Sequence, residues 1–182
     1  MKLRLAEPEI LVDLADIPSM SYIREKDSGL AIGGMTTYKE IESSGILPKA
    51  LSEAAGLVAD PQVRNRGTIG GSLAHSDPAA DLPAPVIALG GQIIATSKDG
   101  DRTIPSEDFF TDLFSTALTD EELITEVFIP KPSSETGTAY CKFGNKASHY
   151  AVAGVAASLT VYKSGSCIGA RIGGTGTGPS AY

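Results

Sequence analysis

Cysteine and histidine are scarce in this chain, which has two of each among its 182 residues. Cys141 and Cys167 lie too far apart for a Cys-x-x-Cys site, and an iron–sulfur cluster bound by one chain needs about four cysteines. We therefore expect no iron–sulfur cluster and no metal site in this chain. Two reduced and buried thiols are the simpler interpretation of the cysteines.

Long apolar runs and clusters of basic residues are also absent. No segment approaches the ~20 apolar residues that a membrane helix needs, and residues 1–10 lack the apolar core of a signal peptide. These absences predict a cytoplasmic chain without a transmembrane segment. The formal net charge is −7, and the basic residues are scattered. Nucleic-acid binding is disfavoured because it requires a positive field.

Periodic patterns predict a mixture of short strands and short helices. Apolar alternation bounded by turn residues predicts strands over 10–14, 22–25, 30–32, 92–96, 123–129, 138–143, 150–162 and 167–173. Thr36 or Thr37 is a candidate N-cap for a first helix, with Glu40 near the capping-box position. Apolar residues at helical spacing predict a second helix over 49–59. The alanine-rich stretch 153–157 also allows a helix, but the β-branched residues that follow it favour a strand.

A stretch rich in proline, serine and glycine after Pro130 indicates a boundary between two parts, 1–130 and 131–182. The sequence pattern of the second part predicts three strands and no helix that would cover them. A three-stranded sheet with one bare apolar face is not a stable unit. We therefore expect the chain to be incomplete at this end.

Residues 60–85 have the least ordinary composition, with many glycines, prolines and small side chains and no clear period before residue 84. The segment 64–73 has the features of an anion-binding loop, because glycines permit positive φ and let backbone N–H groups converge on an oxyanion. Asp81 follows, and its carboxylate can accept hydrogen bonds from sugar-like hydroxyls. Composition alone still favours ordinary turn chemistry over a ligand site.

Residues 64–83, RNRGTIGGSLAHSDPAADLP, resemble the second flavin-binding motif in the medium subunit of molybdenum hydroxylases, the carbon monoxide dehydrogenase and xanthine dehydrogenase family. Four further segments resemble the family in the same order, and the resemblance covers essentially the whole chain. They are the link between the two FAD subdomains (1–17), the strand and helix after it (30–41), the last strand of the flavin domain (121–130) and the start of the C-terminal domain (139–157).

The resemblance implies an α+β fold. Residues 1–130 would form the second subdomain of a PCMH-type FAD-binding domain, with a mixed or antiparallel sheet and helices. Residues 131–182 would form the start of a small α+β C-terminal domain. The family's first FAD subdomain, with its Ala-Gly-Gly-x-Ser-like loop, has no counterpart in the sequence. We therefore expect either a split gene, in which another polypeptide supplies that subdomain, or a truncated chain.

The resemblance also assigns roles to single residues. Contacts to the FAD phosphates or ribityl chain, through backbone and hydroxyl groups, are implied for Thr68, Ile69, Gly70 and Gly71. Ser72 stands where the family often has Asn, and Asp81 would bind ribityl hydroxyls. Ile124 would pack beside the flavin.

Four further residues have open alternatives. Lys142 matches a lysine near the polar edge of the flavin ring, where a positive charge favours the anionic reduced form, but a solvated strand lysine is an equal alternative. Tyr150 would approach the isoalloxazine from one face or be a core aromatic residue. Arg64 and Arg66 would meet phosphate, or at least one of them would be solvated. His75 is interpreted as a surface or loop histidine.

The function that the resemblance implies is electron transfer as part of an oxidoreductase. The expected partners are a large subunit with the molybdopterin cofactor and a small subunit with 2Fe-2S clusters. Electrons would pass from the clusters through FAD to an acceptor, and the large subunit would select the substrate. Two alternatives are another flavin enzyme, the reductase of UDP-sugar cell-wall precursors, and a non-catalytic piece that mediates assembly without binding flavin by itself.

Overall fold

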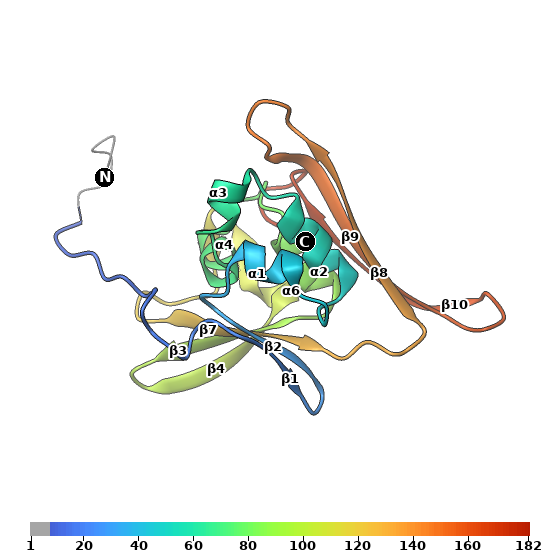
Figure 1. Ribbon diagram of the computed structural model, residues 1–182, viewed down its shortest axis with the longest axis horizontal. Helices are drawn as coiled ribbons and strands as arrows, with labels where there is room; N and C mark the ends of the chain where they lie inside the picture. Colours follow the sequence, from blue (N-terminus) through green and yellow to red (C-terminus); the bar gives the residue numbers. More distant parts are fainter. Residues whose placement is uncertain (1–7) are drawn as a thin grey trace.

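The computed structural model describes residues 8–182 and contains two main antiparallel β-sheets with helices between them (Figure 1). The larger sheet has five strands in the order β1-β2-β7-β3-β4. Its strands are β1 (Ile23–Lys26), β2 (Gly29–Gly33), β3 (Gln92–Ser97), β4 (Gly100–Pro105) and β7 (Leu123–Pro130). The late strand β7 lies between the hairpins β1–β2 and β3–β4, so it joins distant parts of the sequence into one sheet.

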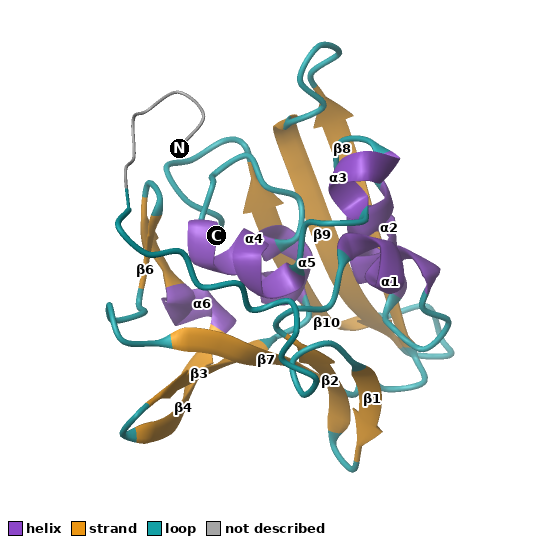
Figure 2. Cartoon of the chain, turned by 60° about the vertical axis from the view of Figure 1, so that its left-hand side comes forward, coloured by secondary structure: helices purple, strands orange, loops and turns teal. Residues whose placement is uncertain are grey.

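The second sheet has three long strands in the order β10-β9-β8. They are β8 (Thr136–Gly144), β9 (Ala151–Val161) and β10 (Cys167–Thr175). A small ribbon is formed by β5 (Phe110–Asp112) and β6 (Ser115–Thr116). One face of the three-stranded sheet packs on helices, as Figure 2 shows, and the other leaves apolar side chains such as Phe143, Val155 and Ile172 exposed.

Six short helices within residues 8–182 fill the space between the sheets. They are α1 (Tyr38–Ser43), α2 (Lys49–Gly56), α3 (Pro61–Arg64), α4 (Ile69–His75), α5 (Pro83–Ala88) and α6 (Ser106–Phe109). Every residue of α5 is buried, and this helix contacts both β9 and β10. The core therefore runs from the five-stranded sheet through the helices to the inner face of the second sheet.

Most of the predicted elements are confirmed, and so is the α+β fold class. Thr37 caps α1 with a complete capping box, in which its side chain and that of Glu40 bond to each other's backbone N–H. The second helix, the hairpin β1–β2, the strand β3 and the strands after residue 120 lie where the patterns predict them, whereas β4 was not predicted. The alanine-rich stretch 153–157 is strand, as its β-branched neighbours favoured.

Three predictions are wrong. Residues 10–14 form no strand, and Ile10, Leu11 and Val12 are 67–79% exposed, because no neighbouring strand or helix covers them. The segment 64–73 lies largely in the helices α3 and α4 rather than in an anion-binding loop, because the side chains of Asp60 and Thr68 cap these helices. Both cysteines are exposed rather than buried, and neither forms a disulfide.

Two absences hold for the part of the chain that the structure describes. Residues 8–182 contain no helix that is long and apolar enough to cross a membrane. They also contain no group of three or more histidine, cysteine, aspartate or glutamate side chains placed to hold a metal ion. The division of the chain near residue 131 stays a prediction.

Candidate functional site

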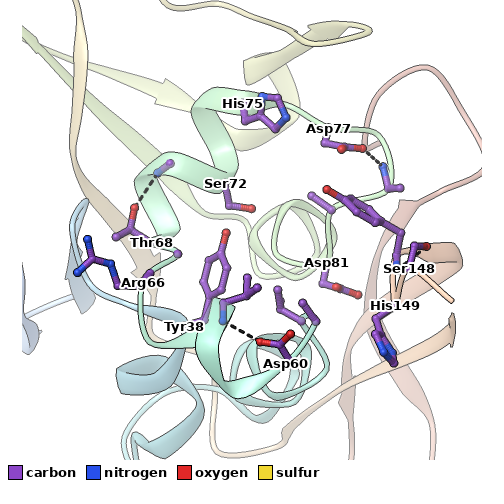
Figure 3. A pocket seen from close by; sticks show the side chains of 18 of the residues that line it. Tyr38, Asp60, Arg66, Thr68, Ser72, His75, Asp77, Asp81, Ser148 and His149 are labelled. Atoms are coloured by element: carbon purple, nitrogen blue, oxygen red, sulfur yellow. Dashed lines mark hydrogen bonds between the residues drawn. The ribbon is translucent and has the colours of Figure 1, made fainter. Parts of the chain in front are cut away.

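A cavity of about 680 Å³ lies where α1, α3 and α4 meet the loop before α5 and the loop between β8 and β9 (Figure 3). The first of these loops directly follows α4, whereas the second comes from a distant part of the sequence. The residues that line the cavity are Tyr38, Val58, Ala59, Asp60, Val63, Arg66, Gly67, Thr68, Gly71, Ser72, His75, Asp77, Ala79, Ala80, Asp81, Ala147, Ser148, His149 and Tyr150.

The helix α4 places one of its two faces on this cavity. Thr68, Gly71, Ser72 and His75 line the cavity and follow the spacing of one helical face. The opposite face, which includes Leu73, is buried in the core. The predicted motif residues are therefore divided, since Thr68, Gly71 and Ser72 reach the cavity whereas Ile69 and Gly70 do not.

The expected convergence of free backbone N–H groups on an anion is not found in this segment. The N–H of Ile69 donates to the Thr36 carbonyl at 3.0 Å, and that of Gly70 donates to the Gly34 carbonyl at 2.8 Å. The N–H of Gly71 donates to the Thr68 hydroxyl at 3.1 Å. None of the glycines in 64–73 has positive φ. The first turn of α4 is therefore satisfied within the protein.

Close packing requires a glycine at position 70. A Cβ at this position would lie 2.6 Å from the carbonyl oxygen of Gly34, in the loop after β2. Gly34 in turn meets the carbonyl of Ile124 on β7, and Ile124 is itself only 6% exposed. The predicted site residues Gly70 and Ile124 thus belong to one backbone contact that joins α4 to the sheet. Neither lines the cavity.

Asp81 and Lys142, two predicted site residues 61 positions apart in sequence, form an ion pair of 2.7 Å at the cavity wall. Only 5% of each side chain is exposed, so the alternative of a solvated strand lysine is wrong. The other Asp81 oxygen accepts a hydrogen bond of 2.7 Å from the Tyr140 hydroxyl. Burial raises the pKa of Asp81, and the hydrogen bonds from Lys142 and Tyr140 oppose that rise.

The loop that carries Asp81 is bound by the end of β10. The Thr175 hydroxyl lies 2.7 Å from the carbonyl oxygens of both Pro78 and Ala80, so its single proton serves one of them at a time. The N–H of Gly176 also donates to Pro78, at 2.7 Å. The three-stranded sheet therefore supports the loop that forms this part of the cavity wall.

Tyr38 and His75 line the cavity although the sequence patterns did not single them out as site residues. The hydroxyl of Tyr38 points toward Ser72 (Figure 3), and burial raises the pKa of that hydroxyl. Gly67 leaves room for the Tyr38 ring, which a Cβ there would overlap. His75 packs on Phe114 with ring centroids 5.2 Å apart. The helical spacing of Thr68 and His75 was the available signal for the histidine.

The two arginines of the motif have different surroundings. Arg64 donates to the carbonyl oxygens of Val58 and Ala59 at 3.0 and 3.3 Å and pairs with Glu42 at 3.4 Å. It is therefore neither a phosphate ligand nor a solvated side chain, because it holds the end of α2. Arg66 is exposed and lines the cavity.

Left-handed backbone conformations gather around the cavity. Ala59 and His149 have φ of 39° and 60°, and both residues line the cavity. Ser76 and Phe114, with φ of 50° and 51°, directly follow or contact His75. Such conformations are uncommon outside glycine and tend to gather at functional sites. Tyr150, next to His149, is 51% exposed, so it is not a core aromatic residue.

The chemistry of this lining fits a ligand with a flat ring system, hydroxyls and phosphate. Apolar walls come from residues such as Val58, Val63 and Ala80, which suit a ring. Hydroxyl groups come from Thr68 and Ser72, and Asp81 offers a fixed carboxylate to hydroxyl groups of a ligand. The volume lies within the usual range of ~300–1,000 Å³ for cofactor sites. An FAD molecule that also contacts a neighbouring polypeptide is compatible with this lining.

Comparisons with known proteins agree with these features. Residues 1–132 match the model of the FAD binding domain in molybdopterin dehydrogenase. The chain is 42% identical to the carbon monoxide dehydrogenase medium chain of Hydrogenophaga pseudoflava and 38% identical to the 6-hydroxypseudooxynicotine dehydrogenase complex subunit alpha of Paenarthrobacter nicotinovorans. All of this chain is covered in both cases, and it spans 64% and 62% of those relatives.

Solved structures show the same similarity. A crystal structure of the Cu,Mo-CO dehydrogenase matches the whole chain with a TM-score of 0.95 at 39% identity. The carbon monoxide dehydrogenase of Hydrogenophaga pseudoflava that lacks the Mo-pyranopterin moiety matches with a TM-score of 0.94 at 42% identity. The chain covers 64% of the matched chain in each of these structures.

Proposed function

The chain belongs to the family of FAD-binding domains of molybdopterin dehydrogenases, and we propose that it contributes part of the FAD site of a molybdenum hydroxylase complex. The observation that carries the proposal is the cavity between α4 and the Asp81 loop. Its wall combines hydroxyls, a buried carboxylate and apolar surface within a fold that matches solved carbon monoxide dehydrogenases.

The predicted site residues have different roles in this proposal. Thr68 and Ser72 direct their hydroxyls to the phosphate or ribityl part of FAD, and Gly71 lets the cofactor approach the backbone of α4. Asp81 accepts hydrogen bonds from ribityl hydroxyls, for which it has lone pairs beyond those used by Tyr140 and Lys142. Ile69, Gly70 and Ile124 act indirectly by holding α4 against the sheet.

Tyr150 is proposed to face the flavin ring, and Lys142, which pairs with Asp81 and does not line the cavity, to act on the ring through its charge. FAD supplies the redox chemistry when bound, by accepting electrons and passing them on. Lys142 provides a positive charge that stabilises negative charge on a nearby ring, and its pairing with Asp81 tempers this effect. Tyr150 is exposed at the rim of the cavity, where an aromatic side chain can cover one face of the ring.

The complex is proposed to include a large subunit with the molybdopterin cofactor and a small subunit with 2Fe-2S clusters. Several relatives are named as medium chains or subunits of dehydrogenase complexes, which supports such an assembly. Electrons would pass from the clusters through FAD to an acceptor. The large subunit would select the substrate, and the family's first FAD subdomain would complete the cofactor site.

A spectroscopic titration tests the proposal. Purified chain is mixed with FAD, alone and together with a polypeptide that carries an Ala-Gly-Gly-x-Ser subdomain, and the visible flavin spectrum and fluorescence are followed. We expect weak or no binding alone and tight binding with the second polypeptide. A mixture that never takes up flavin but still binds the other subunits would contradict the proposal and support the assembly alternative.

A pair of glycine variants makes this test specific for the cavity. Gly71→Val places a side chain on the cavity face of α4, where the nearest atom to a Cβ is the Thr68 hydroxyl oxygen at 3.0 Å. Gly45→Val adds the same side chain where no atom lies within 4 Å. FAD uptake should fall in the first variant and stay normal in the second. Equal uptake by both variants would show that FAD does not contact this face.

A further inference from the structure

We propose that Tyr140 is a positioning residue, whose hydroxyl holds the Asp81 carboxylate in the one orientation that presents it to the cavity. The identity of the ligand, FAD, rests on the proposed function above. Tyr140 itself does not line the cavity and is 6% exposed, so it acts through Asp81 rather than on the ligand.

The two oxygens of Asp81 are held from the same strand. Tyr140 and Lys142 are next-but-one neighbours on β8, so their side chains lie on one face of the sheet. The Tyr140 hydroxyl bonds Oδ1 and the Lys142 ammonium group bonds Oδ2, each at 2.7 Å. Two bonds from fixed points to two different oxygens determine the plane of the carboxylate. A single bond to Lys142 would leave the group free to rotate.

The place for the Tyr140 hydroxyl is built into the sheet. β9 has a glycine, Gly154, opposite Lys142, and a Cβ at that glycine would overlap the Tyr140 hydroxyl and crowd the Thr175 methyl group. The backbone N–H of Tyr140 donates to Glu53 on α2 at 2.8 Å. The hydroxyl group and the backbone N–H of Tyr140 are therefore both held in place before any ligand binds.

The backbone next to Asp81 leaves little other freedom. Thr175 and Gly176 bond the carbonyl oxygens of Pro78 and Ala80. With the loop held in this way, the torsion of the Asp81 side chain is the main motion that could misplace its oxygens. Tyr140 and Lys142 are the groups that restrain this torsion.

The hydrogen bond also affects protonation. Burial raises the pKa of Asp81, and the bonds from Lys142 and Tyr140 both lower it. Loss of the tyrosine hydroxyl should therefore raise the pKa of Asp81 further. Besides Tyr140 and Lys142 from β8, the titratable groups that surround Asp81 at the cavity are Tyr38, Asp60, Arg66, His75, Asp77, His149 and Tyr150.

The first test needs no cofactor. Asp81 in the chain with isotope-labelled aspartate is titrated by carboxyl carbon NMR in the wild type, in Tyr140→Phe and in Tyr22→Phe. Tyr22→Phe is the matched control, because its hydroxyl bonds the carboxylate of Glu126, also at 2.7 Å, on the other sheet. The Asp81 midpoint should rise in Tyr140→Phe and stay unchanged in Tyr22→Phe. An unchanged midpoint in Tyr140→Phe would overturn the proposal.

The second test measures FAD affinity across pH with the polypeptide that completes the site. Tyr140→Phe should weaken binding about tenfold, the effect of one hydrogen bond to a charged group. The loss should grow as the pH falls from about 8 to about 5, because Asp81 is protonated earlier in the variant. A loss that is equal at every pH, or equal in Tyr22→Phe, would show a merely structural role and overturn the proposal. A wild type that binds no FAD would refute the proposed function, while the NMR titration still decides the role of Tyr140.

Discussion

The fold contains two clusters in which a carboxylate is bonded by a tyrosine and a lysine, and they behave differently. Glu126 on β7 accepts from Tyr22 at 2.7 Å and from Lys26 at 2.7 and 2.9 Å, with Arg24 at 3.5 Å. Burial opposes its ionisation, but the bonds from Lys26 and Tyr22 outweigh burial and lower its pKa. For Asp81, burial outweighs Lys142 and Tyr140, and the pKa is raised.

The difference follows from the surroundings of the two carboxylates, because Glu126 has both Lys26 and Arg24 near it, whereas Asp81 pairs with Lys142 and is more deeply buried. The side chains of Lys26 and Arg24 are 41% and 58% exposed, whereas that of Lys142 is 5% exposed. Water therefore shares the stabilisation of the Glu126 cluster, which lies on the five-stranded sheet. The Asp81 cluster depends wholly on protein partners and borders the cavity. A tyrosine, a lysine and a carboxylate thus form a network at the surface in one region and a buried cluster at the cavity wall in the other.

Removing one member of the buried cluster should have the largest effect. Asp81→Ala leaves Lys142 charged and without a counterion, so the free energy of unfolding should fall by about 3 kcal/mol, the lower end for a broken buried ion pair. The remaining bond from Lys142 to the Leu57 carbonyl limits the loss. Denaturant unfolding measures the change.

The double variant is the control for that prediction. Asp81→Ala combined with Lys142→Met removes both charges, and part of the lost stability should return. A double variant less stable than the sum of the two single variants would contradict the description of this pair as a buried, mutually compensating one.

Gly70→Val tests whether the neighbouring motif belongs to the ligand site or to the core. Its side chain would collide with the Gly34 carbonyl, so the free energy of unfolding should fall by about 2 kcal/mol, as is typical of overpacking. Gly71→Ala, on the cavity face of the same helix, should cost less. Thermal unfolding of both variants measures the change, and a Gly70→Val variant as stable as the wild type would contradict the packing role of Gly70.

Glu126→Ala should cost only about 1 kcal/mol, because Lys26 and Arg24 can be solvated when their partner is lost. The free energy of unfolding of Glu126→Ala is measured under the same conditions as that of Asp81→Ala, and the two losses are compared. An equal or larger loss for Glu126→Ala would contradict the contrast between the two clusters.

The smallest effect is on the pH dependence of unfolding. Glu126 has a lowered pKa in the fold, so its contribution is present above the unfolded pKa and is lost as the pH falls through the folded pKa. Asp81 has a raised pKa, so stability is lost as the pH rises from the unfolded value through the folded one. Glu126→Gln should therefore flatten the acid side of the unfolding profile. An unchanged acid side would show that another carboxylate dominates it.

Local patterns were sufficient for much of the fold. The hairpin β1–β2 follows from alternation around a polar turn, and the cap of α1 follows from Thr37 and Glu40. The helix α4 was missed because its glycines hide the helical period. Residues 10–14 were predicted as a strand because an apolar run alone does not show whether a neighbouring strand exists.

The sequence by itself determined the family, the α+β class and the residues around which the candidate site is built. The order of residues in the motif 64–83 indicated the family, and the 42% identity to a carbon monoxide dehydrogenase medium chain agrees with that assignment. Short-range signals of this kind can be recognised in the sequence because caps, turns and helical faces depend on residues that are near neighbours along the chain.

Only the tertiary structure decided which of those residues line the cavity, which pack in the core and which pair with each other. It turned Gly70 and Ile124 toward the core, and it joined Asp81 to Lys142 across 61 positions of sequence. It also brought in Tyr140, which no motif had indicated. The physical reason is that burial and pairing depend on contacts between distant segments, and a carboxylate has its charge and direction set by those contacts.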